Sequence, residues 1–462
     1  MARKLHAQNS PASEAQAADL WSPFEPRSSS AWTVEAAGRL LGRLGLGYTH
    51  SQLRAALQEG PAMTLDSLFE ACGRAEGFNG RFDAFEDSGL ESDSTAELSA
   101  WWLRRMIETP TPLLERMTLF WCEHFGVAAA AVKNARLLAQ HVRTVRKHAL
   151  GRFDDLLGCV LKDPAYYLSF GASDNRKSNP NLHFGEILLG CHTVGPGAYG
   201  PVDAHAVARA VTGFVVRGGR LRFREREHDG SLKTVLGTGG VKGVEDLAAV
   251  LSRSKATARF IVRRLCRAFV SEEYRWPDEL LEPLVEEFAQ KRDIAALLRK
   301  ITGSRLFFSP QVQSAVKKNP AVWAVGIARA FETVVPTAPL AEDLSALGYG
   351  LFEPPGEGGW EGGQRWGSTC ELMLRVRLAE ALFFKSDRYG GRLDPLELCR
   401  KHRIKGPQNT IKFFCDLFWR GERDGRILQC FREALEAERG RPGSALKAVV
   451  AAVVSAPPAL VT

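Results

Sequence analysis

The chain has 462 residues, of which 45% are hydrophobic and 25% charged, the balance of an ordinary soluble globular protein. Its net charge of +8 comes mostly from arginine, and no recognisable RNA- or DNA-binding module accompanies it, which argues against nucleic acid as a partner. The most apolar run, residues 445–461, is interrupted by Lys447, Pro457 and Pro458, so we expect no transmembrane segment.

The first residues carry Arg3 and Lys4 with no apolar stretch behind them, so we expect no secretory signal. Nine cysteines are scattered along the chain and never form a Cys-x-x-Cys pair. This spacing argues against a disulfide framework and against a zinc ribbon. These features predict a reduced, cytoplasmic protein.

Residues 1–30 are rich in Ser, Ala, Gln and Pro and predict a disordered, mobile tail. From Thr33 the pattern becomes helical, and a short helix is expected to end at Gly60. The polar stretch from Gly77 to Ser94 predicts a surface loop. Helices are then expected over residues 96–109, 112–126 and 131–149, the first of them stopped by Pro110 and Pro112.

One segment predicts β-structure. Leu221 and Phe223 alternate with arginines, and Asp229-Gly230 is a favoured two-residue turn, so a hairpin is expected at about residues 220–236. Helical patterns resume afterwards and continue to the end, apart from a glycine-rich loop at 348–367. The fold class is therefore mainly α: residues 31–462 form one large multi-helix domain with one small β-hairpin, and sub-boundaries are expected near residues 95 and 320.

The stretch from Asp174 to Gly195 contains many polar and ionisable side chains that could bind a ligand or a metal. It begins with a polar loop whose side chains could hydrogen-bond a sugar or a phosphate, or could form local turns. The candidate residues of this loop are Asp174, Asn175, Arg176, Asn179 and Asn181.

A short helix after the loop carries His183, Glu186 and His192. His183 and Glu186 are three residues apart and share a helix face, and His124 and Cys122 add further ligand types from an earlier helix. Together they form a candidate site for a divalent metal, with His124 and His192 at its centre. The alternative is structural: His192 caps helix carbonyls and His124 is a core histidine. No cofactor motif accompanies them.

A third candidate lies in LFEPPGEGGWEGGQRW, where Trp360, Arg365 and Trp366 follow glycines. The indole rings could stack on a sugar, or could fix the loop to the core. The glycine pattern is not a nucleotide fingerprint, because no strand precedes it and no Gly-Lys-Ser/Thr follows.

Five blocks together resemble a bacterial family known only as domain of unknown function 1800, of which this chain would be a divergent member. They are AAGRLLGRLGLG at 36–47, WWLRRMIETPTPLLERMTLFWCEHF at 101–125, RKHALGRFDDLL through PNLHFGEILLGCHTVG at 146–195, ARAVTGF through ARFIVRRLCRAFVSEE, and LGYGLFEPPGEGGWEGGQRW at 347–366. The resemblance implies a large helical bacterial protein, without an established activity, often encoded beside a sulfatase-like protein with a twin-arginine export signal. Export in complex with such a partner is then an alternative to a cytoplasmic location.

The chain departs from the pattern that the family usually shows. Where the family reads P-N-E-N-[YF]-A-R-E-L-L-E-L-H-T-L-G, the glutamates are replaced by Leu182, Ile187 and Gly190, while His192 is kept. In the F-W-H-N-H-F block the first His is Cys122 and the Asn is Glu123, while His124 is kept. A typical member could gather several His and Glu side chains, and this chain has lost much of that set.

These departures favour a non-catalytic or catalytically degenerate binding or assembly partner, with the sulfatase-like protein as the partner that the resemblance implies. The alternative is a metal-dependent, hydrolase-like enzyme acting on a glycan or another polar substrate. A third hypothesis is the binding of an anionic polymer through the arginines. The sequence does not decide whether the protein is an enzyme, and it gives neither the substrate nor the oligomeric state.

Overall fold

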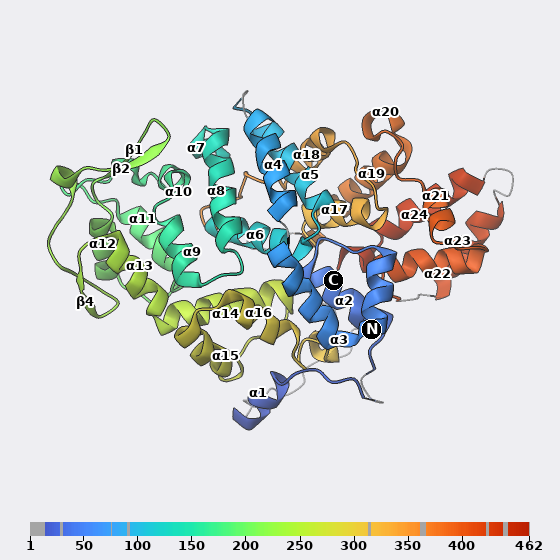
Figure 1. The fold of residues 1–462 in the computed structure, drawn as a ribbon, viewed down its shortest axis with the longest axis horizontal. Helices are drawn as coiled ribbons and strands as arrows, with labels where there is room; N and C mark the ends of the chain where they lie inside the picture. Colours follow the sequence, from blue (N-terminus) through green and yellow to red (C-terminus); the bar gives the residue numbers. More distant parts are fainter. Residues whose placement is uncertain are drawn as a thin grey trace.

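In the computed structural model, the described residues are 14–27, 31–74, 76–89, 93–312, 316–360, 366–421, 425–437 and 442–461. Helices dominate this part of the chain, which confirms the predicted fold class (Figure 1). No helix among the described residues is long and apolar enough to cross a membrane.

The chain starts in the middle of the body, runs to one end, and returns to build the other end (Figure 1). The first half of the chain contains α1 (Glu14–Leu20), α2 (Val34–Leu44), α3 (His50–Ala71), α4 (Glu76–Gly89), α5 (Thr95–Glu108), α6 (Pro112–Phe125), α7 (Ala129–Val132), α8 (Ala135–His148), α9 (Phe153–Val160), α10 (Pro164–Ser169), α11 (Leu182–Ile187), a π-helical turn (Leu188–His192) and α12 (Pro201–Ala210). The second half contains α13 (Val244–Arg253), α14 (Lys255–Phe269), α15 (Asp278–Lys291), α16 (Ile294–Thr302), α17 (Pro320–Ala330), α18 (Thr337–Ala346), α19 (Thr369–Phe384), α20 (Ser386–Tyr389), α21 (Pro395–Lys401), α22 (Pro407–Phe418), α23 (Gly425–Ala437) and α24 (Pro442–Ser455).

Many helix ends lie where capping residues in the sequence place them. Ser94, Asn181 and Ser368 each accept a backbone N–H of the helix that follows them. The predicted break at Gly60 is confirmed, since Gly60 has φ of 83° and interrupts α3 in front of Pro61. One hydrophobic cluster runs from Ala17 to Leu460 across both expected sub-boundaries. The domain division itself stays a prediction.

The β-structure differs in detail from the expected hairpin. There are two antiparallel hairpins: β1 (Phe214–Arg217) pairs with β2 (Arg220–Phe223), and β3 (Lys233–Val235) pairs with β4 (Thr238–Val241). The turns are Gly218-Gly219 and Leu236-Gly237, all with positive φ, as two-residue hairpin turns require. The expected turn at Asp229-Gly230 is wrong, because the Asp229 carboxylate accepts bonds from the side chains of Arg209 and Ser231 instead.

Two expected loops contain helical or packed structure. Residues 1–13 and 28–30 of the expected tail lie outside the described residues, but residues 14–27 form α1 and a segment that joins the core. Trp21 is 2% exposed and donates to the Leu280 carbonyl oxygen at 2.7 Å.

The prediction of a loop at 77–94 is wrong, because most of this segment forms the helix α4. Its Phe78 and Phe82, one turn apart, contact each other with ring centroids 4.5 Å apart and cover the Arg105 guanidinium.

A buried carboxylate on α6 joins three helices. Glu115 is fully buried and accepts from Arg105 Nε on α5 at 2.8 Å and from Arg146 Nε on α8 at 2.7 Å. Trp102 Nε1 donates to its second oxygen at 3.2 Å. Burial by itself opposes ionisation of this carboxyl, but Arg146 and Arg105 outweigh it and keep the pKa of Glu115 below its ordinary value.

Replacing Glu115→Gln is expected to lower the free energy of unfolding by about 3–5 kcal/mol, because two buried guanidinium groups lose their counter-charge. Since the folded-state pKa of Glu115 is lowered, its contribution is present above pH 4.5 and is lost as the pH falls through the folded pKa. Denaturant unfolding at pH 7 measures the loss. Glu108→Gln, which removes the exposed partner of Arg104, is the control and should cost less than about 1 kcal/mol. Equal losses in the two variants would contradict this role of Glu115.

Candidate functional site

A cavity of about 410 Å³ lies between α6, α14 and the loop that leads into α19. Its volume is within the range of small-molecule sites. Four cationic side chains, two carboxyl groups and four aromatic rings contribute to the lining, together with Asn319 and parts of the 190–196 segment. They are Arg116, Arg264, Arg267, Lys317, Glu123, Glu272, Phe120, Phe260, Trp360 and Trp366.

Two helices present matching faces to this cavity. Arg116, Phe120 and Glu123 are spaced by four and three residues on α6, so their side chains share one face. Phe260, Arg264 and Arg267 have the same spacing on α14. On α6 the aromatic ring lies between two charged groups, on α14 it precedes two arginines, and the two rows line the same space.

The third wall is the glycine-tryptophan loop, which lies against the end of α6. The backbone N–H of Trp360 donates to the Glu123 backbone carbonyl oxygen at 3.1 Å. Gly359 has φ of 73°, and a Cβ at this position would overlap the same carbonyl oxygen. Gly126, the left-handed cap of α6, lies so near that its Cβ would be 3.0 Å from Gly359 Cα. This close approach of two backbones requires glycine and places Trp360 and Trp366 beside the cavity.

Positive charge dominates the lining. Arg116 lies with its guanidinium 5.2 Å from the centre of the Phe269 ring, and its Nη1 is buried without a hydrogen-bond acceptor among the described residues. Lys317 lies 4.0 Å from Glu273, a distance that neutralises it only weakly. Several other arginines among the described residues also have a buried nitrogen without an acceptor, but Arg116 is the one of them that lines this cavity.

Glu123 is the carboxyl group on the inner wall. Its Oε1 accepts from Asn319 Nδ2 at 2.7 Å and from the hydroxyl of Tyr349. Burial raises the pKa of Glu123 above its ordinary value, although Arg116 and these two hydrogen bonds oppose the shift. Tyr349 itself is fully buried and packs against Trp360, with ring centroids 4.6 Å apart. The carboxyl is thereby connected to the loop that forms the opposite wall.

The structure brings His124 and His192 together, but inside the core. Both are fully buried, and their ring centroids are 5.7 Å apart. His124 Nε2 donates to the His192 carbonyl oxygen at 3.0 Å. His192 Nε2 donates to the Glu357 carbonyl oxygen at 3.3 Å, so its Nδ1 accepts from the Tyr166 hydroxyl at 2.7 Å. Burial, together with Arg264, lowers the pKa of His192 to about 3, which keeps its ring neutral.

The other predicted metal ligands lie apart from this pair. His183 is half exposed and contacts Glu357 at 2.7 Å, Glu186 points to solvent, and burial raises the pKa of the Cys122 thiol. Over the described ranges of the chain, no group of three or more His, Cys, Asp or Glu side chains is arranged to hold a metal ion. The His pair is accordingly held by hydrogen bonds to backbone and to Tyr166.

The amides of the polar loop bind the protein's own backbone. Asn175 is buried, accepts from the Asn181 N–H at 2.8 Å and donates to the Ala208 carbonyl oxygen. Asn181 caps α11 through Phe184 and also donates to Gly171. Arg176 pairs with Asp174, and Asn179 bonds back to the backbone of Arg176. Ligand binding by this loop stays a prediction.

Of the third predicted group, Trp360 and Trp366 line the cavity, whereas Arg365 lies outside the described residues. Both indoles are less than 8% exposed, so they form a wall rather than an open platform. The sequence analysis missed Arg116, Glu123, Arg264 and Lys317 as site residues. The repeated four-three spacing of charged and aromatic residues on two helices was the available signal.

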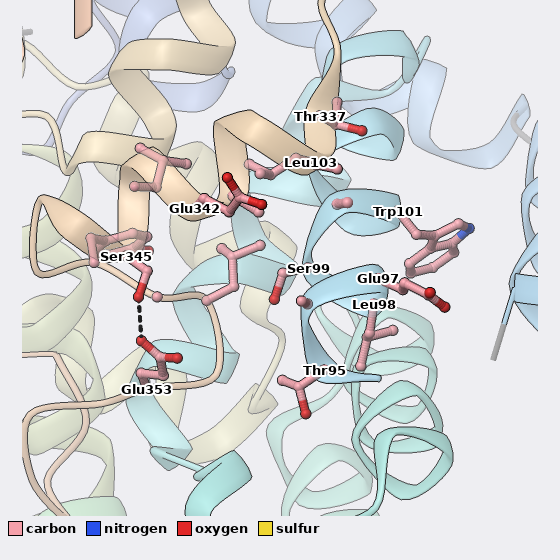
Figure 2. A pocket seen from close by; sticks show the side chains of 18 of the residues that line it. Thr95, Glu97, Leu98, Ser99, Trp101, Leu103, Thr337, Glu342, Ser345 and Glu353 are labelled. Atoms are coloured by element: carbon pink, nitrogen blue, oxygen red, sulfur yellow. Dashed lines mark hydrogen bonds between the residues drawn. The ribbon is translucent and has the colours of Figure 1, made fainter. Parts of the chain in front are cut away.

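A larger apolar groove, of about 800 Å³, lies between α5 and α18 (Figure 2). Its lining includes nearly every residue from Thr95 to Arg104, on all sides of the first turns of α5, so the space curves around the helix instead of enclosing one site. Several of its polar groups already have partners: Ser345 donates to Glu353, and Glu342 pairs with Arg388. The cavity beside α6 is for this reason the stronger candidate.

A Cys–His pair lies in another cleft, of about 410 Å³, which includes α9 and α13 in its lining. Cys159 Sγ lies 3.4 Å from His148 Nε2. Burial raises the pKa of the thiol and lowers that of the imidazole, which favours the neutral pair over a reactive thiolate.

Gly359→Ala is expected to destabilise the protein by about 2 kcal/mol or more, because the new methyl group meets the α6 backbone and the residue keeps a positive φ. The near-ultraviolet circular dichroism of the tryptophans should change at the same time. Gly356→Ala is a control in the same loop, since nothing lies within 4 Å of its Cβ position and its φ is not positive. Similar effects of the two substitutions would contradict the proposed seating of the loop on α6.

Comparison with known proteins gives a family but no activity. The family described as "Protein of unknown function (DUF1800)" matches residues 39–460. No curated protein and no solved structure matches the chain. The match covers most of the 462 residues, including every described residue that lines the cavity beside α6. The chain belongs to the family of proteins of unknown function DUF1800.

Proposed function

We propose that this protein acts by binding, and that the cavity beside α6 binds a small organic anion with a flat or apolar face. The observation that carries the proposal is the gathering of four cationic side chains in one aromatic-lined cavity, where the buried Arg116 Nη1 has no acceptor among the described residues. A sulfonate, phosphate or carboxylate group would supply the missing acceptor, and a guanidinium suits such oxyanions by its planar shape.

The aromatic lining supports the second part of the proposal. Phe120, Phe260, Trp360 and Trp366 give the cavity apolar walls on three sides of the charged groups. Inorganic anions gain nothing from such walls, whereas a ligand with a ring or apolar face loses water-exposed surface against them. The ligand class is therefore an anion attached to an apolar or ring-shaped body.

The alternative of a metal-dependent enzyme has less support. Of its four main predicted ligands, His124 and His192 are buried in the core, whereas His183 and Glu186 lie at the surface. Both ring nitrogens of His192 already have protein partners. Near-stoichiometric metal in untagged protein purified without chelator, lost in a His124→Ala/His192→Ala variant, would favour it. The sulfatase-like partner and the binding of an anionic polymer remain predictions from the sequence.

Calorimetric titration with three matched probes tests the proposed ligand class. 1-Naphthalenesulfonate should bind more tightly than 1-naphthalenesulfonamide, which has the same rings without the charge, and more tightly than inorganic sulfate. Arg116→Gln should weaken sulfonate binding by about tenfold, the usual value of one charge-assisted hydrogen bond. Arg253→Gln, an exposed arginine in the cleft beside α13, is the control. Equal binding of sulfonate and sulfonamide, or no binding at all, would overturn the proposal.

The Glu123 carboxyl gives the same site a pH dependence. Its pKa is raised in the folded protein, so it is partly protonated above pH 4.5 and becomes a repelling carboxylate as the pH rises further. Affinity for 1-naphthalenesulfonate, which stays ionised throughout, should fall as the pH rises through the folded pKa of Glu123. Glu123→Gln should remove this decline and strengthen binding above that pKa by about threefold to tenfold. An unchanged pH profile in the variant would exclude Glu123 as the titrating group.

A further inference from the structure

One helix of the protein carries an apolar stripe on its exposed face. Met373, Val376 and Phe384 of α19 are 65%, 41% and 46% exposed, and these fractions are high for such large apolar side chains. The other exposed large apolar residues of the described chain are spread over different elements. Scattered residues of this kind need no explanation, but a row on one helix face indicates an interaction surface.

The stripe also contains two charges of opposite sign. Arg377 and Glu380 are exposed, and by their spacing they lie on the same face as Met373, Val376 and Phe384. No ion pair or hydrogen bond of either side chain is found within the described part of the chain. The opposite face of α19 is occupied, since Leu378, Ala379 and Leu382 are buried and the helix packs on α24.

The order of these residues is self-complementary for an antiparallel pairing of two α19 helices. If a two-fold axis passes between Leu378 and Ala379, Arg377 lies opposite Glu380 of the second copy, and Met373 lies opposite its Phe384. A two-fold interface requires this property, because the same surface must match itself after rotation. A parallel pairing of the same two helices would place like charges opposite each other.

We infer that a second copy of this chain binds along α19 and that the protein forms a two-fold dimer through this helix. The contact runs from Met373 to Phe384, about 17 Å of helix at 1.5 Å per residue. A single helix pair of this length buries less than the standard interface of roughly 800 Å² per partner. The expected dimer is therefore weak, with a dissociation constant on the order of micromolar.

Sedimentation equilibrium of the full chain between 1 and 200 µM tests the inference. The wild type should pass from monomer to dimer over this range. Arg377→Glu and Glu380→Arg should each raise the dissociation constant by about tenfold, because each places two like-charge pairs across the axis. The double variant Arg377→Glu/Glu380→Arg should restore dimerisation, since the pairs are then reversed but complementary.

Two controls separate this result from other causes. Val202→Asp changes an exposed apolar residue on α12, far from α19 in the chain, and should leave the dimer unchanged. The helical circular dichroism and melting temperature of all the variants should match the wild type, because the altered side chains are exposed. A protein that stays monomeric at 200 µM, or a double variant that fails to regain dimerisation, would overturn the inference. The exposed stripe on α19 would then be a binding surface for a different protein.

Discussion

The position of α6 is the constraint on which the candidate site depends. Its buried carboxylate, Glu115, is fixed between Arg105 of α5 and Arg146 of α8, and this arrangement leaves little freedom for rotation of the helix. A buried ion cluster of this kind contributes little net stability compared with an apolar core, but it strongly disfavours arrangements in which a charge loses its partner. The next residue, Arg116, begins the row that faces the cavity. The rotation of α6 that the contacts of Glu115 fix therefore also determines that Phe120 and Glu123, up to two turns later, face the cavity.

The other end of α6 is fixed by backbone contact. Gly126 and Gly359 allow the loop to approach the last turn, and the loop then brings Tyr349 and Trp360 against Glu123. Glu123 and Gly190 both line the cavity, so two of the positions at which the sequence departs from the expected family pattern lie in the same space.

Local signals in the sequence were sufficient for most of the fold. The predicted break at Gly60 is confirmed, and in the structure Ser94 and Asn181 cap the helices that follow them. The prediction of the hairpin turn was wrong because the sequence contains two turn signals, Gly218-Gly219 and Asp229-Gly230. Gly218-Gly219 connects β1 to β2, whereas the Asp229 side chain accepts a hydrogen bond from Arg209 of α12. Among the predicted site residues, Trp360 and Trp366 do line the cavity. Arg116 and Glu123 were missed, because on α6 alone their spacing resembles that of an ordinary polar helix face, and it indicates a site only when α14 is known to lie opposite.

The cavity and the stripe on α19 belong to one continuous segment. Trp366 forms part of the cavity wall, Ser368 caps α19 two residues later, and the exposed stripe starts at Met373. A ligand against Trp366 and a second chain against Met373 would therefore act on opposite ends of a stretch of fewer than ten residues. Since α19 is one continuous helix packed on α24, a shift at its capped end would also move its exposed face. Any difference in ligand affinity between monomer and dimer would have to act through this helix, and by linkage the ligand would change dimerisation by the same factor.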